Sequence, residues 1–321
     1  VLFRSTKIMP IKAGDASGAF LQSNIARAVI YAYEHGADVI NMSFGGSACT
    51  IAVQDALSVA YSRCVLVAAA GNDAVPNEES DFFNKYALNK PIPFYPAALS
   101  YVIGVMSMDW TGMESEYTNW DCKLNNSVEY EVYAPGEGIL STIPGDNYMT
   151  MSGTSMAAPV VAAEAALLRS YYPDTNTYPT KFIYGQIIGT ATGIVKCCNE
   201  NRHSIYGDKH NLPGYINFYD AMVRMPVPSI GVSSYNIFDT VGYKQDTDGI
   251  TAGCETINNG DGIVDAGEII ALGFVLKNRW GIGKNTTVHL DVKTEAGVEN
   301  PYVTILNNDI NYGDIGTYSE T

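Results

Sequence analysis

One segment carries more structural information than any other part of this 321-residue sequence: Gly153-Thr154-Ser155-Met156-Ala157-Ala158-Pro159, continuing into Val160-Val161-Ala162-Ala163-Glu164-Ala165-Ala166-Leu167-Leu168. The continuation is apolar except for Glu164, so it predicts a buried helix. Pro159 fits the first turn of such a helix, where a missing N–H group costs little. Ser155 then lies at the helix N-terminus, whose dipole favours negative charge. The segment is typical either of a reactive serine or of a capped core helix, since Ser and Thr commonly start helices.

Two further segments, which precede the serine in the chain, favour the reactive serine. They read Val39-Ile40-Asn41-Met42-Ser43-Phe44-Gly45-Gly46 and Val65-Leu66-Val67-Ala68-Ala69-Ala70-Gly71-Asn72-Asp73. In this order, and together with residues 153–159, they resemble the motifs of the subtilisin-like serine proteases (subtilases), and the resemblance runs from about Lys7 to Met222. It implies an α/β fold with a parallel sheet and helices on both faces. It also implies serine endopeptidase activity on polypeptide substrates.

The resemblance assigns roles to individual residues of this sequence. Ser155 is the expected nucleophile, which forms the acyl-enzyme, and Asn72 is the expected side-chain donor to the oxyanion. An amide suits that role because it offers a neutral N–H group toward an oxygen that becomes negative only in the transition state. The remaining expected site residues bind substrate: the first four pair with an extended peptide and the last two lie near the pocket beside the scissile bond, namely Ser43, Phe44, Gly45, Gly46, Ala70 and Gly71.

A serine protease also needs a base and an acid to activate its nucleophile. Subtilases carry both upstream of the part that residues 12–15 resemble, and this sequence has no His before His35. Since Gly36 follows His35, that histidine is predicted to end a helix. The other three histidines match no catalytic element of the family: His203, His210 and His289. We therefore expect a fragment whose base and acid lie in a missing upstream segment, and which has little turnover alone.

Two alternatives belong to other functional classes. A catalytically inactive subtilase-like module would keep the groove and bind polypeptides, but Ser155, Asn72 and the segment 43–46 are all intact, which favours the enzyme. An esterase of the α/β-hydrolase type requires Gly-x-Ser-x-Gly. Ala157 stands where its second glycine should be, which argues against this class.

Hydrophobic patterning predicts the order of the elements. Strands at residues 8–12, 38–44, 64–70 and 101–106 alternate with helices at 21–35 and 51–63, and this alternation is typical of a parallel sheet.

Two prolines near residue 226 predict a domain boundary. Residues 1–226 form a subtilisin-like peptidase domain, truncated at its N-terminus, and residues 227–321 an immunoglobulin-like β-sandwich accessory domain, truncated at its C-terminus. The second prediction depends on strand-like runs at 268–276 and 287–292.

Composition restricts ligands and partners. The net charge of −15 argues against nucleic acid, and no apolar run reaches the ~18–20 residues that a membrane span needs. Six cysteines form an even set compatible with disulfides and an extracellular or cell-envelope location: Cys49, Cys64, Cys122, Cys197, Cys198 and Cys254.

No metal or cofactor is expected to be required for the reaction. Cys197 and Cys198 with His203 and His210 lack the usual zinc spacing. A loop resembling a calcium (Ca²⁺) site keeps that ion a candidate ligand, although Ile257 occupies its first ligand position; the other positions hold Asn259, Asp261, Gly262 and Glu268.

Overall fold

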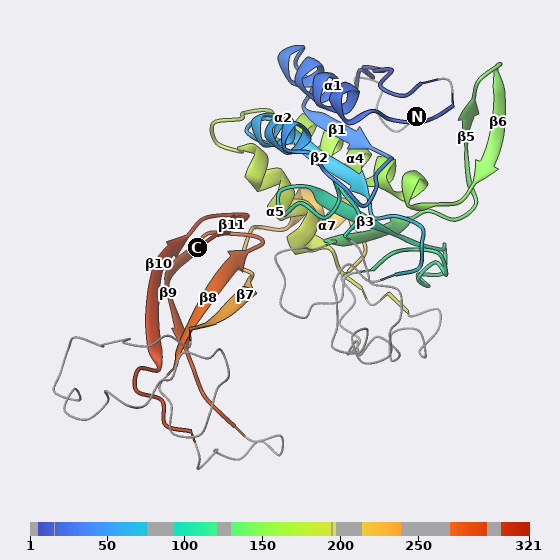
Figure 1. The fold of residues 1–321 in the computed structure, drawn as a ribbon. Helices are drawn as coiled ribbons and strands as arrows, with labels where there is room; N and C mark the ends of the chain where they lie inside the picture. Colours follow the sequence, from blue (N-terminus) through green and yellow to red (C-terminus); the bar gives the residue numbers. More distant parts are fainter. Residues whose placement is uncertain are drawn as a thin grey trace.

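The computed structural model describes residues 6–15, 17–75, 93–120, 130–193, 195–196, 214–238, 270–293 and 303–321. Its centre is a four-stranded, fully parallel sheet in the order β1-β2-β3-β4 (Figure 1). The strands are β1 (Val39–Met42), β2 (Val65–Ala69), β3 (Ile103–Met108) and β4 (Val132–Pro135). All side chains of β2 and β3 are buried, as expected for strands covered on both faces.

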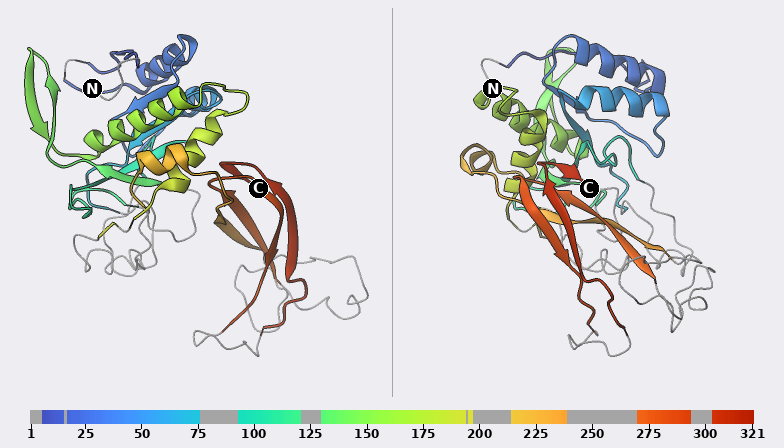
Figure 2. Two further views of the ribbon diagram at one scale, coloured as in Figure 1. Left: turned by 180° about the vertical axis from the view of Figure 1, so that it is seen from behind. Right: turned by 90° about the vertical axis from the view of Figure 1, so that its left-hand side faces the viewer.

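Helices cover both faces of this sheet, as Figure 2 shows from two sides. Residues of β2 alternate between two apolar cores: Leu66 and Ala68 pack with helices α1 (Gln22–Glu34) and α2 (Ile51–Tyr61). Val65 and Val67 face the opposite core, which contains the helices α4 (Thr154–Tyr171), α5 (Thr180–Thr190) and α7 (Phe218–Val223). The predicted fold class is therefore confirmed, because the alternating pattern of the chain gives one sheet between two helical layers.

One predicted strand is wrong. Residues 8–12 form no strand, and Ile8 is 88% exposed. An extended segment becomes a strand only when a neighbour takes up its N–H and C=O groups, and no described strand pairs with this one. The other strands and helices predicted for residues 21–106 are found, with ends shifted by at most two residues.

A long β-hairpin leads directly into α4. Strands β5 (Ile139–Ile143) and β6 (Asn147–Met151) pair antiparallel, and the hairpin extends away from the rest of the molecule (Figure 1). Sequence analysis had not predicted it.

The C-terminal part consists of antiparallel strands, here called the C-terminal module. A three-stranded sheet has the order β11-β8-β7, and β9 and β10 form a second, two-stranded sheet. The bounds are β7 (Ile230–Phe238), β8 (Ala271–Asn278), β9 (Gly283–His289), β10 (Asp309–Ile315) and β11 (Ser319–Glu320). Antiparallel strands are confirmed, whereas the immunoglobulin-like class and the boundary at residue 226 stay predictions. The candidate calcium loop lies outside the described residues.

Candidate active site

Ser155 is the second residue of α4 and lies beside the carboxyl end of β1. Gly153, which precedes the helix, has φ 157° and ψ 160°, and its N–H donates to the carbonyl of Gly136 at 2.9 Å, just after β4. Side-chain-bearing residues rarely adopt this φ, so glycine is the residue that permits the sharp entry into α4. The turn leaves Ser155 half-buried at the helix N-terminus, as the sequence predicts.

Ser43 and Ser155 form a reciprocal pair of hydrogen bonds. The Ser155 hydroxyl donates to the Ser43 carbonyl at 3.2 Å, and the Ser43 hydroxyl donates to the Ser155 carbonyl at 2.8 Å. Pro159 explains the second bond and corrects the prediction made for it. It is the sixth residue of α4, beyond the first turn. Proline has no N–H group, so the carbonyl of Ser155, four residues earlier, lacks its helical donor, and the Ser43 hydroxyl replaces that donor.

Asn72 follows β2 and is held by the start of α4. Its Oδ1 accepts from both the N–H and the hydroxyl of Thr154, each at 2.9 Å. The Thr154 hydroxyl in turn accepts from the N–H of Gly71 at 3.2 Å. Both bonds engage Oδ1, whereas the amide nitrogen Nδ2, which also lies close to Gly153, donates to none of the described residues. An N–H donor is thus available next to the nucleophile.

The residues expected to bind substrate differ in whether their backbone N–H and C=O groups are already hydrogen-bonded. Gly46 exchanges two hydrogen bonds with Tyr95, at 2.9 and 2.8 Å, so its N–H and C=O are already used. The intervening residues Phe44 and Gly45 make no backbone hydrogen bond to another described residue outside the strands. Ser43 lies after the end of β1, which the structure places at Met42. Within the described ranges, therefore, the backbone groups of residues 44–45 have no main-chain partner.

Ala70 and Gly71 are buried and bonded internally. The Ala70 carbonyl accepts from the Asn119 side chain at 3.0 Å, and the Gly71 carbonyl accepts from the Asn119 N–H at 3.0 Å. The same side chain accepts from the N–H of Asp73 at 2.9 Å. Asn119, which sequence analysis missed, thus fixes the loop that carries Asn72. Asn119 does not follow a recognisable strand pattern, so nothing in the neighbouring sequence pointed to it.

Neither described histidine faces the nucleophile. His35 lies directly after the end of α1. Its Nδ1 is 2.8 Å from the Tyr31 carbonyl oxygen, and its ring stacks on the ring of Tyr31. This position precedes β1, whereas Ser155 lies beyond its carboxyl end. His289 Nδ1 is 2.8 Å from Asp309 Oδ1 on the exposed surface of the C-terminal module. His203 and His210 are outside the described residues.

A cavity of about 270 Å³ lies beside the free backbone of residues 44–45. Most of the side chains that line it are apolar, although polar atoms make up more than half of its accessible surface. The lining comes from the segment before α1, from α1 and α2, from the loop after β1 and from residues 95–96; it includes Phe20, Ile25, Phe44, Cys49, Val53 and Pro96. Burial raises the pKa of the Cys49 thiol, so this side chain behaves as a neutral apolar group. The sequence did not predict this cavity because the residues that line it lie far apart in the chain, between residues 18 and 96.

Glu164 is the one acidic residue of α4, the helix of the nucleophile, and its pKa is strongly raised. Its side chain is fully buried, neither carboxylate oxygen has a hydrogen-bond partner among the described residues, and burial raises its pKa to about 8. It shares a helix face with Ala157, Val161 and Leu168, which belong to the apolar core. The described residues contain no group of three or more His, Cys, Asp or Glu side chains placed to hold a metal ion.

Known proteins similar to this chain identify its family. The sequence profile of the Subtilase family (Peptidase_S8) matches residues 2–207. This chain belongs to the Subtilase family. It is 37% identical over 167 residues to a thermophilic serine proteinase of Bacillus sp. (strain AK1), covering 52% of this chain and 36% of that protein. It is 33% identical over 191 residues to subtilisin DY of Bacillus licheniformis, covering 59% of this chain and 62% of that protein.

A solved structure of the patellamide maturation protease PatA shares the fold, with a TM-score of 0.50 and 27% identity over 65% of this subtilase chain and 70% of the PatA chain. The subtilase chain thus spans less than two thirds of the two curated relatives, and the family profile ends before the C-terminal module. None of the helices in the described ranges combines the length and apolarity that a membrane span requires.

Proposed function

We propose that this chain is the part of a serine endopeptidase that carries the nucleophile and the oxyanion donor. The convergence of three elements at one point carries the proposal. Ser155 at the start of α4 is hydrogen-bonded to Ser43 after β1 at 2.8 and 3.2 Å, and the neighbouring Thr154 is hydrogen-bonded to Asn72 after β2 at 2.9 Å. The carboxyl ends of parallel strands are where α/β proteins place their ligands.

In the proposed reaction, Ser155 Oγ attacks the carbonyl carbon of the scissile peptide bond while a base accepts its proton. The carbonyl oxygen becomes negative and is stabilised by Asn72 Nδ2 and the Ser155 N–H at the positive end of α4. The base then protonates the leaving amine, the C–N bond breaks, and an acyl-enzyme on Ser155 remains. Water, activated by the same base, hydrolyses this ester and restores the hydroxyl.

The free backbone groups and the cavity support an extended polypeptide as the substrate. Main-chain pairing with Phe44 and Gly45 would hold the peptide without regard to its sequence. The adjacent cavity of about 270 Å³ would then accept one apolar side chain of the peptide, because its walls include Phe20, Ile25 and Val53. Ala70 and Gly71 remain proposed neighbours of the pocket beside the scissile bond, although both are buried in the described structure.

We propose that the histidine base and the acid come from a segment outside residues 1–321, because neither described histidine faces Ser155 and His203 and His210 match no catalytic element of the family. In the described structure the Ser155 hydroxyl donates to a carbonyl, which cannot act as the base. The proposal therefore predicts little or no turnover by residues 1–321 alone. Calcium is not required in any step.

Active-site labelling tests the proposal. Two proteins are compared with a fluorophosphonate probe: the 321-residue chain, and the product of the complete open reading frame that encodes it. Ser155→Ala variants of both are the controls. We expect slow or no labelling of the chain and rapid labelling of the complete product, lost in its Ser155→Ala variant. If the complete product folds but Ser155 stays unlabelled, the enzyme assignment is wrong, and retained binding of an unfolded polypeptide would favour the inactive binding module.

The proposed location is extracellular or in the cell envelope. It depends on the even number of cysteines rather than on a bridge, because the two that the structure describes, Cys49 and Cys64, are free thiols. Detection of the complete product by antibody in culture medium and envelope fractions supports this location, whereas recovery in the cytoplasm alone contradicts it.

A further inference from the structure

Helix α5 is buried on two opposite sides. Ile183 and Ile187 belong to the apolar core between the sheet and α4, whereas Gly185 and Gly189 face the C-terminal module. A methyl group on Gly189 would overlap the indole ring of Trp280, so the absence of a side chain there permits the close approach. One helix therefore forms part of both the α/β core and the contact with the module.

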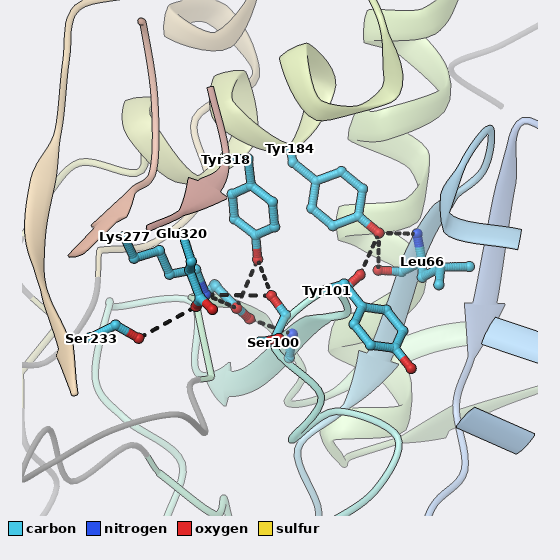
Figure 3. A network of polar contacts seen from close by, with 10 residues as sticks. Leu66, Ser100, Tyr101, Tyr184, Ser233, Lys277, Tyr318 and Glu320 are labelled. Carbon is cyan, nitrogen blue, oxygen red and sulfur yellow. Dashed lines mark hydrogen bonds and ion pairs between the residues drawn. The ribbon is translucent and has the colours of Figure 1, made fainter. Parts of the chain in front are cut away.

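A buried ion pair crosses the same contact. Lys277 Nζ on β8 lies 3.8 Å from Glu131 Oε1, just before β4, and the two side chains are 3% and 1% exposed. Glu131 Oε2 accepts from the N–H of Gly104 in β3 at 2.7 Å, and the Tyr318 hydroxyl donates to Oε1 at 3.0 Å. Figure 3 shows Lys277 and Tyr318 reaching from the module toward Ser100 in the α/β domain. The carboxylate that anchors β3 thus obtains its counter-charge from the module.

Apolar and aromatic contacts extend this interface. The Tyr318 ring lies 4.8 Å from the ring of Tyr184 on α5, and Tyr318 is a member of the same buried cluster as α4 and the sheet. Trp280 is 4% exposed and donates from Nε1 to Gln186 Oε1 at 2.5 Å. Domains that are merely tethered meet through smaller, more polar surfaces and move relative to one another. This contact has instead the composition of a domain interior.

We propose that the C-terminal module is an obligate part of the α/β domain's fold, and that α5 and Glu131 form the surface to which the module of the same chain docks. The two parts would unfold as one unit. Removing the module would take Lys277 and the Tyr318 hydroxyl away from the buried Glu131 carboxylate and would expose the ring of Tyr184 that Tyr318 covers. Both changes are unfavourable for a folded α/β domain. The family profile, which ends at residue 207, does not include this partner.

Hydrogen exchange on the whole chain tests this coupling. Leu276→Ala removes a buried side chain that β8 directs to the face opposite Lys277, away from Glu131. The observed probes are the most protected amides of α4, whose Val161, Ala165 and Leu168 belong to an apolar core that does not include Leu276. Coupled unfolding predicts that they exchange about 10²-fold faster or more, as expected for a large-to-small core substitution. Unchanged exchange in α4, with acceleration only in the module, would overturn the proposal.

Two further variants keep the test decisive. Leu276→Val removes less of the side chain and should increase the exchange rate of the same α4 amides by about tenfold. It can therefore be used if Leu276→Ala does not fold. Lys277→Met should accelerate them by about 10²-fold because it removes the buried cation that lies 3.8 Å from the Glu131 carboxylate. The matched control is Lys293→Met, which removes a half-exposed lysine paired with Asp291. We expect no change in this control; equal effects of both lysine substitutions would contradict the role of the buried pair.

Discussion

Glu164 makes the stability of this subtilase depend on pH in a way that one substitution should remove. The carboxyl is fully buried on α4 without a hydrogen-bond partner, and burial is the cause that raises its pKa from 4.5 to about 8. The folded protein therefore keeps this proton up to about pH 8, whereas the unfolded chain releases it near pH 4.5. Because the unfolded state loses the proton first, raising the pH from 4.5 to 8 stabilises the unfolded state and lowers the free energy of unfolding.

The size of the effect follows from the two pKa values. A shift from 4.5 to about 8, at about 1.4 kcal/mol per pKa unit, corresponds to a loss of roughly 5 kcal/mol once the pH exceeds both values. Between pH 5 and pH 8 the expected loss is about 3 kcal/mol. Glu164→Gln keeps the shape of the side chain but has no proton to release, so its stability should lack this component.

Urea unfolding at pH 5, 6, 7 and 8 measures the difference directly. The other titrating groups affect the parent chain and Glu164→Gln equally and cancel in their difference. We expect similar stability at pH 5 and an advantage of about 3 kcal/mol for Glu164→Gln at pH 8. Glu34→Gln, which changes an exposed glutamate at the end of α1, is the control and should follow the parent. Parallel stability curves for the parent and Glu164→Gln would refute the reasoning, because they would mean that Glu164 titrates alike in both states.

Three more substitutions test single contacts. Asn72→Ala in the complete active protein should lower kcat by about 10²–10³ with little change in KM, a range measured in subtilisin itself, a member of this family; an unchanged kcat would exclude Asn72 as an oxyanion donor. Tyr184→Phe removes the hydroxyl that accepts from the buried Leu66 N–H at 2.7 Å, and should cost about 1–3 kcal/mol in urea unfolding, whereas a cost near zero would show that this N–H finds another partner. Ser43→Ala leaves the Ser155 carbonyl without the donor that compensates for the proline in α4, so thermal unfolding should show a loss of about 1 kcal/mol; no loss would mean that water replaces the hydroxyl.

The site was predictable to the extent that its parts are local. Ser155 before an apolar run, and Asn72 directly after a buried strand, were both identified from neighbouring residues, and the structure brings them together through Thr154. The reciprocal bonds between Ser43 and Ser155 were not predicted, since they join residues 112 positions apart. The misplacement of Pro159 in the first turn has the same origin: the actual start of α4 at Thr154 depends on the conformation of Gly153.

The sequence by itself determined the family, the order of strands and helices in the α/β domain, and the identity of the expected nucleophile, because hydrophobic periodicity and short motifs are properties of adjacent residues. Only the tertiary structure decided that residues 8–12 form no strand, since pairing requires a neighbour that sequence does not specify. It also decided that Glu131 meets Lys277 and Tyr318, the latter 187 residues away. Contacts at such separation depend on how the chain packs, and no local pattern predicts them.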